Sequence, residues 1–139
     1  MRAILILLLL STTLLQPATA NTARVSGCDE PTTIAQTECR VRQIDAANAK
    51  LQQYLDAARK RVLQFGVDPT ALQVEQAAWE NYRLKHCGNV YDLWAKGTIR
   101  YEMSASCTLL TTRQRTFDVW RAYLTFLDST PPLLPDPSQ

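Results

Sequence analysis

Four cysteines are the residues of this sequence with the clearest covalent chemistry: Cys28, Cys39, Cys87 and Cys107. An even number of cysteines is typical of paired disulfides when a chain folds in an oxidising compartment. Zinc binding is the alternative, with His86 as a further candidate ligand. However, these cysteines do not form the closely spaced pairs that structural zinc sites use. We therefore expect two disulfides and no metal site.

The residue types needed for catalysis are sparse. His86 is the only histidine, and it adjoins Cys87, whose thiol we expect a disulfide to block. The sequence has no Cys-x-x-Cys redox motif. Because the whole chain has only four glycines, it also lacks a glycine-rich loop of the kind that cradles phosphate groups. We predict that the protein is not an enzyme and that it uses no cofactor.

A second set of residues, which includes polar and charged side chains, recurs at steps of three and four along the sequence. This spacing places them on one face of a helix. The members of this face are Leu72, Gln76, Trp79, Arg83, His86 and Val90. A buried polar group without a partner costs about 1–3 kcal/mol, and a charge costs more. Gln76 and Arg83 should therefore find partners in the folded chain.

Three predicted helices position these residues. Apolar positions recur at helical spacing over residues 34–65, 69–96 and 99–127. Gly66 and Gly97 are suitable places for the first two helices to end. Because the connections are short, the first two helices should be antiparallel neighbours. The predicted fold class is all-α, a small antiparallel three-helix bundle with two disulfides.

The first turn also predicts which polar residues meet. Both helices rise about 1.5 Å per residue from the turn after Gly66, so Arg83 should lie within about one turn of Asp45 and Asn48. We favour an inward polar network of Asp45, Asn48, Gln76 and Arg83 that fixes the helix register. The alternative is a cleft around Arg83 that receives an anionic ligand or a partner's carboxylate.

The second turn predicts the disulfide pairing. With that turn centred near Gly97, Cys87 faces Cys107 in the next helix. This places the two Cα atoms within the separation of under about 7 Å that a disulfide needs. Cys28 then pairs with Cys39 by elimination, which ties the N-terminal segment to the first helix.

Residues 1–20 have the features of a signal peptide. They combine Arg2, an unbroken apolar run over residues 4–10 and the small-residue pattern Ala18-Thr19-Ala20. The run is too short to span a bilayer in the usual way. We expect an exported protein, periplasmic or secreted. The segment before Cys28 also resembles a lipobox, but lipidation there would leave an odd number of cysteines, so we favour it less.

The remaining chain divides into a helical domain over residues 21–128 and a tail over residues 129–139. The tail is rich in proline, and we expect it to be disordered or extended. Its segment Pro132-Leu133-Leu134-Pro135 matches a proline-rich ligand pattern, although a solvated tail is the favoured interpretation. The net charge is only +2, so the sequence lacks the clustered excess of Lys and Arg that nucleic-acid binding needs.

The order and spacing of these residues resemble the lysozyme inhibitor LprI-like family of small exported bacterial proteins. The resemblance covers roughly residues 28–117. In its N-terminal half it rests on Cys28, Cys39 and Asp45-x-x-Asn48. In its C-terminal half it rests on Leu72, Gln76, Trp79, Tyr82, Arg83, Cys87, Gly97-Thr98-Ile99, Cys107, Thr111 and Arg113.

The sequence departs from the family pattern at Ala47 and Leu51, where the family usually has Leu and Tyr. The segment between Cys87 and Gly97 is also short and carries Tyr91 and Trp94. The family takes its name from inhibition of lysozyme by a few members. The resemblance therefore implies a non-enzymatic envelope protein that binds a protein partner, with lysozyme as a candidate.

We expect a partner to bind near the second turn, where aromatic and basic residues gather: Tyr91, Trp94, Lys96, Arg100 and Tyr101. Tyr, Trp and Arg are the residue types that dominate interface energies. The alternative function is binding of a small ligand or cell-wall fragment in a cleft around Arg83. The sequence indicates neither a membrane span nor an oligomeric state.

Overall fold

The computed structural model describes residues 27–139, so the predicted signal peptide lies outside the described residues. The described part contains three helices: α1 Thr33–Gln64, α2 Thr70–Leu93 and α3 Ile99–Tyr123. This confirms the predicted all-α fold class. The second and third helices end three and four residues earlier than we predicted. None of the described helices is long and apolar enough to cross a membrane.

Local side-chain bonds account for several helix ends. Thr32 caps α1, since its hydroxyl accepts a hydrogen bond from the Ala35 amide (3.2 Å). Gly66 adopts a φ of 69°, a conformation that favours glycine, where the chain leaves α1. Arg61 Nη1 donates to the carbonyls of Tyr123 (2.6 Å) and Thr125 (2.8 Å), which satisfies acceptors left free at the end of α3. Arg61 thereby helps to end α3 at Tyr123.

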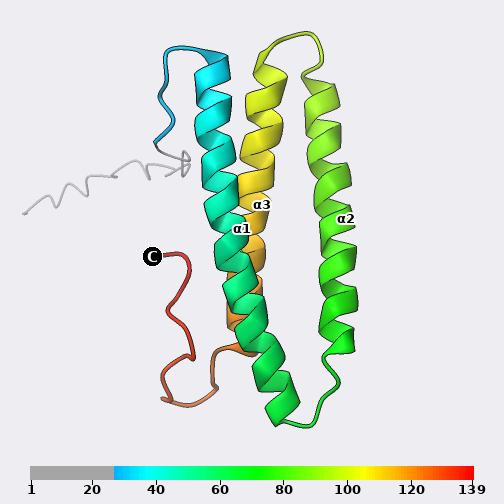
Figure 1. The fold of residues 1–139 in the computed structure, drawn as a ribbon, viewed down its shortest axis with the longest axis vertical. Coiled ribbons are helices and arrows are strands. Elements are labelled where there is room, and N and C mark those ends of the chain that lie inside the picture. Colours follow the sequence, from blue (N-terminus) through cyan, green and yellow to red (C-terminus); the bar gives the residue numbers. More distant parts are fainter. Residues whose placement is uncertain (1–26) are drawn as a thin grey trace, which may run out of the picture.

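The helices are not arranged as three equivalent neighbours. α1 and α3 run parallel and lie side by side, and α2 runs antiparallel to both (Figure 1). α2 also packs against α3, whereas α1 and α2 approach each other at few positions. The prediction that the first two helices are close neighbours is therefore wrong over most of their length.

The distribution of apolar residues explains this arrangement. The core is formed by Leu51, Tyr54, Leu55 and Ala58 of α1, Leu72 of α2, Val119 of α3 and Leu124 after it. Only Leu72 and Cys87 of α2 are buried. Because burial of apolar surface drives packing, α1 and α3 form the main pair and α2 lies against α3.

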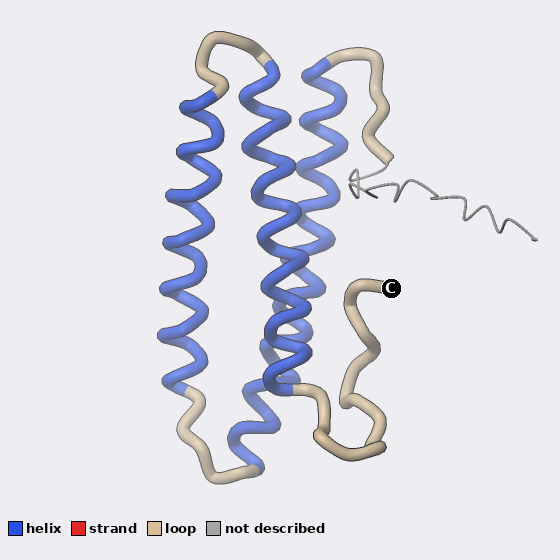
Figure 2. The backbone as a smooth tube through the Cα atoms, turned by 180° about the vertical axis from the view of Figure 1, so that it is seen from behind, coloured by secondary structure: helices blue, strands red, loops and turns tan. Residues whose placement is uncertain are grey.

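The C-terminal tail, which we expected to be disordered or extended and solvated, is packed against the helices. Residues 129–139 form no helix or strand, but they fold back along the α1–α3 pair on the side away from α2 (Figures 1 and 2). The Leu133 amide donates to the Leu124 carbonyl (2.9 Å), and Leu134 packs against the core. The sequence pattern missed this packing because a single apolar residue inserting into a distant core has no periodicity.

Candidate functional site

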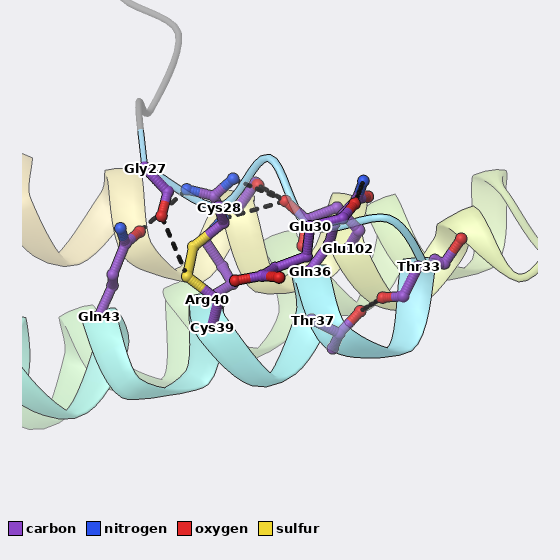
Figure 3. The surroundings of a disulfide bond; sticks show 11 residues. Gly27, Cys28, Glu30, Thr33, Gln36, Thr37, Cys39, Arg40, Gln43 and Glu102 are labelled. Atoms are coloured by element: carbon purple, nitrogen blue, oxygen red, sulfur yellow. Dashed lines mark hydrogen bonds and ion pairs between the residues drawn. A yellow bond between two sulfur atoms is a disulfide. The ribbon is translucent and has the colours of Figure 1, made fainter.

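The two predicted disulfides are present. Cys28 pairs with Cys39 (Cα–Cα 5.7 Å), and Cys87 pairs with Cys107 (Cα–Cα 5.6 Å). The first bond fastens the N-terminal segment to α1, as Figure 3 shows. The second joins α2 to α3. The described chain contains no free thiol, so the sulfur that lipidation would need at Cys28 is already bonded.

Arg83 lies at the centre of contacts between all three helices. Its Nη1 donates to Asn48 Oδ1 of α1 (3.0 Å) and to Thr112 Oγ1 of α3 (2.7 Å). Its guanidinium also lies over the Trp79 ring, with Cζ 4.7 Å from the ring centroid. Arg83 is half-buried rather than enclosed. The sequence argument thus brought Arg83 and Asn48 together, but it did not identify Thr112.

Gln76 belongs to a neighbouring cluster organised by Arg115. The Nε of Arg115 donates to Gln76 Oε1 (3.1 Å), and its Nη1 pairs with Glu75 Oε1 (2.7 Å). The Tyr123 hydroxyl donates to the other oxygen of Glu75 (2.8 Å). Partial burial by itself would raise the pKa of Glu75. The hydrogen bonds from Arg115 and Tyr123, together with the Arg115 charge, outweigh this effect, so the pKa of Glu75 is lowered overall.

Asp45 does not join either cluster. It is exposed and makes no hydrogen bond or ion pair within residues 27–139. The register argument assumed that α1 and α2 are in contact along their length, whereas α2 instead lies against α3. The long side chain of Arg83 still reaches Asn48, but the short side chain of Asp45 has no partner within reach.

A small cavity of about 190 Å³ opens between α1 and α2 beside Arg83. From α1 it is lined by Asn48, Leu51, Gln52 and Leu55. From α2 it is lined by Gln76, Trp79, Glu80 and Arg83. Ligand pockets usually measure about 300–1,000 Å³. This cavity therefore suits a single polar group, such as a carboxylate, better than a whole ligand.

The predicted partner-binding residues lie at the α2–α3 turn. The rings of Tyr91 and Tyr101 meet edge to face (centroids 5.4 Å apart), and Arg100 Cζ lies 4.8 Å and 5.0 Å from their centroids. Hydrogen bonding from Tyr91 and Arg100, together with the Arg100 charge, lowers the pKa of Tyr101. Trp94 and Lys96 are exposed in the turn itself. The structure thus groups three of the five residues and leaves two protruding.

Next to this cluster is an apolar depression of about 500 Å³ between the start of α1 and the start of α3. Its lining includes Ile34, Val41 and Tyr101, whose side chains are 74%, 47% and 47% exposed. The sequence analysis did not identify this depression, because its residues lie far apart along the chain.

The sequence analysis also missed a buried ion pair between α1 and α3. Arg40 donates through Nε (3.0 Å) and Nη2 (2.8 Å) to Glu102 Oε1, which also accepts from Ser106 (3.0 Å). Arg40 lies directly after Cys39 (Figure 3). Paired charges near the N-terminal disulfide therefore join α1 to α3. Within the described residues, no cluster of His, Cys, Asp and Glu is arranged to hold a metal.

These features define an all-α domain in which two disulfides and buried polar contacts supplement a small apolar core. Residues 28–118 match the family described as lysozyme inhibitor LprI, and the chain belongs to that family. The family and the disulfides indicate an exported protein. No curated protein and no solved structure matches the chain.

Proposed function

We propose that this protein is a non-enzymatic binding protein of the cell envelope, periplasmic or secreted, that inhibits a lysozyme. Membership of the lysozyme inhibitor LprI family supports the class of partner. The observation that carries the proposal is the protruding α2–α3 turn, where Trp94 is 43% exposed and Lys96 is exposed beside it.

The chemistry of this turn suits a lysozyme cleft. A lysozyme active site contains two carboxyl groups, one of which stays ionised. Lys96 is free to enter such a cleft and pair with a carboxylate, whereas Arg100 is held between Tyr91 and Tyr101. Trp94 supplies aromatic area of the kind that dominates interface energies. Since the net charge is only +2, recognition depends on contacts at the turn rather than on long-range attraction.

Inhibition assays with a paired control test this proposal. The oxidised chain of residues 21–139 is assayed at physiological salt against several classes of lysozyme. We expect dose-dependent inhibition that weakens about tenfold or more in the double variant Trp94→Ala, Lys96→Ala. The control, Leu84→Ala with Lys85→Ala, removes one exposed large apolar side chain and one exposed lysine from α2, away from the turn, and should inhibit like the parent.

Two results would contradict the proposal in different ways. If the turn variant inhibits as well as the parent, the site is elsewhere on the molecule. If no lysozyme of the panel is inhibited, lysozyme is not the partner.

A second function is supported by the cavity beside Arg83. Both hydrogen bonds of Arg83 use Nη1, so Nε and Nη2 stay available to a carboxylate of a cell-wall fragment. The probe is N-acetylmuramic acid, and neutral N-acetylglucosamine is the control. Binding of the acid alone, followed through the Trp79 indole resonance and lost in Arg83→Gln, is the expected result. Equal shifts with both sugars would contradict it.

A further inference from the structure

The groove between α1 and α3 holds the proline-rich tail through the tail's main chain. Three groove side chains each donate one hydrogen bond to a tail carbonyl, and none donates to a tail side chain within the described residues. The bonds run from Trp120 Nε1 to Leu134 O (2.9 Å), from Tyr54 Oη to Pro135 O (2.7 Å) and from Lys50 Nζ to Pro137 O (3.0 Å). The groove thus binds the main chain of the tail, which bends at residues 133–134 and turns at residues 137–138, rather than particular polar side chains.

This pattern suits a proline-rich peptide. Proline has no amide hydrogen, so an extended proline-rich chain forms no internal hydrogen bonds and leaves its carbonyls free to accept from a partner. Domains that recognise such segments use aromatic-lined grooves. Tyr54 and Trp120 supply an aromatic lining here, and each also supplies a donor.

Only a small part of the tail is anchored by apolar burial. Leu134 packs against the core, whereas Leu133 is 49% exposed and the prolines at 131, 132 and 135 are exposed. A segment with so few buried contacts opens at a lower free energy than the whole domain. We therefore expect the tail to leave the groove without unfolding of the helices.

The groove also extends beyond the tail. A cavity of about 860 Å³ lies between α1 and α3, bounded by residues 137–139 at one end and lined further on by Gln43, Leu110 and Arg113. This space accommodates a longer segment than the tail itself.

We infer that the α1–α3 groove is a recognition site for the main chain of a proline-rich segment of a partner protein, and that residues 131–137 occupy it in cis. This inference does not depend on lysozyme inhibition, whose proposed site is at the α2–α3 turn. Cis occupancy lowers the apparent affinity for a partner in proportion to the fraction of time that the groove is open.

A full-length variant with a dislodged tail tests the inference. Leu134→Glu places a charge where Leu134 meets the core, while the control Leu133→Glu adds the same charge at an exposed neighbouring position. The probe is a fluorescent peptide of residues 129–139. We expect the Leu134→Glu protein to bind it roughly tenfold or more tightly than the wild type and the control, because its groove is open.

Two sets of variants test whether peptide binding depends on the groove's hydrogen bonds and on the prolines of the peptide. Adding Tyr54→Phe and Trp120→Phe to Leu134→Glu should abolish peptide binding. A peptide with alanine in place of Pro132 and Pro135 should bind at least several-fold more weakly, because these exposed prolines restrict the free peptide's backbone and lower the entropy lost on binding. Equal binding of both peptides, or no binding by a folded Leu134→Glu protein, would overturn the inference. Concentration-dependent dimers of the wild type without peptide binding would also overturn it, because the occupant would then be a second copy's tail.

A measurement on the wild type covers the case in which Leu134→Glu does not fold. Solvent exchange of the Trp120 indole proton reports release of the Leu134 carbonyl. Exchange roughly tenfold or more faster than global unfolding is the result expected for a tail that opens locally. Exchange only through global unfolding would show that the tail is a permanent part of the core and would refute the inference.

Discussion

Replacing Arg83 with alanine removes the side chain that joins the three helices. Two hydrogen bonds are lost, to Asn48 and to Thr112, of which Thr112 is fully buried. Bonds to charged groups contribute about 1.5–3 kcal/mol. The groups left behind are partly satisfied, since Thr112 also donates to Thr108 O (2.8 Å) and half-buried Asn48 can bind water. We therefore expect a loss of about 2 kcal/mol in unfolding free energy. This is less than the cost of breaking a buried ion pair, because the substitution leaves no charge unpaired.

Urea unfolding with both disulfides intact measures this loss. Lys85→Ala, an exposed change on the same helix, should stay within about 0.5 kcal/mol of the parent. A double-mutant cycle of Arg83→Ala with Asn48→Ala should show a coupling of about 0.5 kcal/mol or more, because the two side chains are bonded. A loss under about 0.5 kcal/mol for Arg83→Ala, or additive single effects, would refute the interhelical role of Arg83.

Three further perturbations test other parts of the structure. Glu102→Ala removes the carboxylate paired with buried Arg40, which keeps its hydrogen bond to Gln43 Oε1 (2.9 Å), and should lower the unfolding free energy by about 3 kcal/mol in the same urea assay; a loss near zero would show that the pair is not buried in solution. Because the pKa of Glu75 is lowered by folding, its ionised carboxylate stabilises the fold at pH values above the ordinary pKa of glutamate. This stabilisation is lost as the pH falls through the lowered pKa. The stability difference between the parent and Glu75→Gln should accordingly be about 1 kcal/mol or less at pH 7, since Glu75 is partly exposed, and should shrink below about pH 4 in urea midpoints measured from pH 3 to 8; a difference independent of pH would contradict this. Replacing Cys87 and Cys107 with serine opens a 20-residue connection and should cost about 3 kcal/mol, with hydrogen exchange rising in α2 before the α1–α3 pair; uniform exchange across the helices would contradict the loose attachment of α2.

The helices and the disulfide pairing could be predicted from the sequence. Helix formation depends on spacing within a few residues, and each predicted helix appears in the structure with its start near the predicted residue. The pairing of Cys87 with Cys107 followed from their similar distance to the turn at Gly97. Such register arguments hold for neighbours across a short connection, because two helices that leave one turn advance at the same rate.

The candidate site could be predicted only in part. Arg83 and Asn48 were found because a charge and an amide on otherwise apolar helix faces need partners. Thr112 and Arg115 are likewise polar residues of α3 that need partners. The apolar spacing of α3 is irregular near Arg113, however, so it did not indicate which face of α3 packs against α2. Asp45 was included because the register assumed contact between α1 and α2.

The sequence by itself determined the helical class, the approximate helix starts, the two disulfides and the need of Arg83 for interhelical partners. Only the tertiary structure decided that α3 packs against both α1 and α2, that Arg40 pairs with Glu102, and that Leu134 folds back onto the core. The physical reason is distance along the chain. Periodicity and turn geometry act locally, whereas burial of apolar surface and pairing of charges are settled by which distant faces fit together.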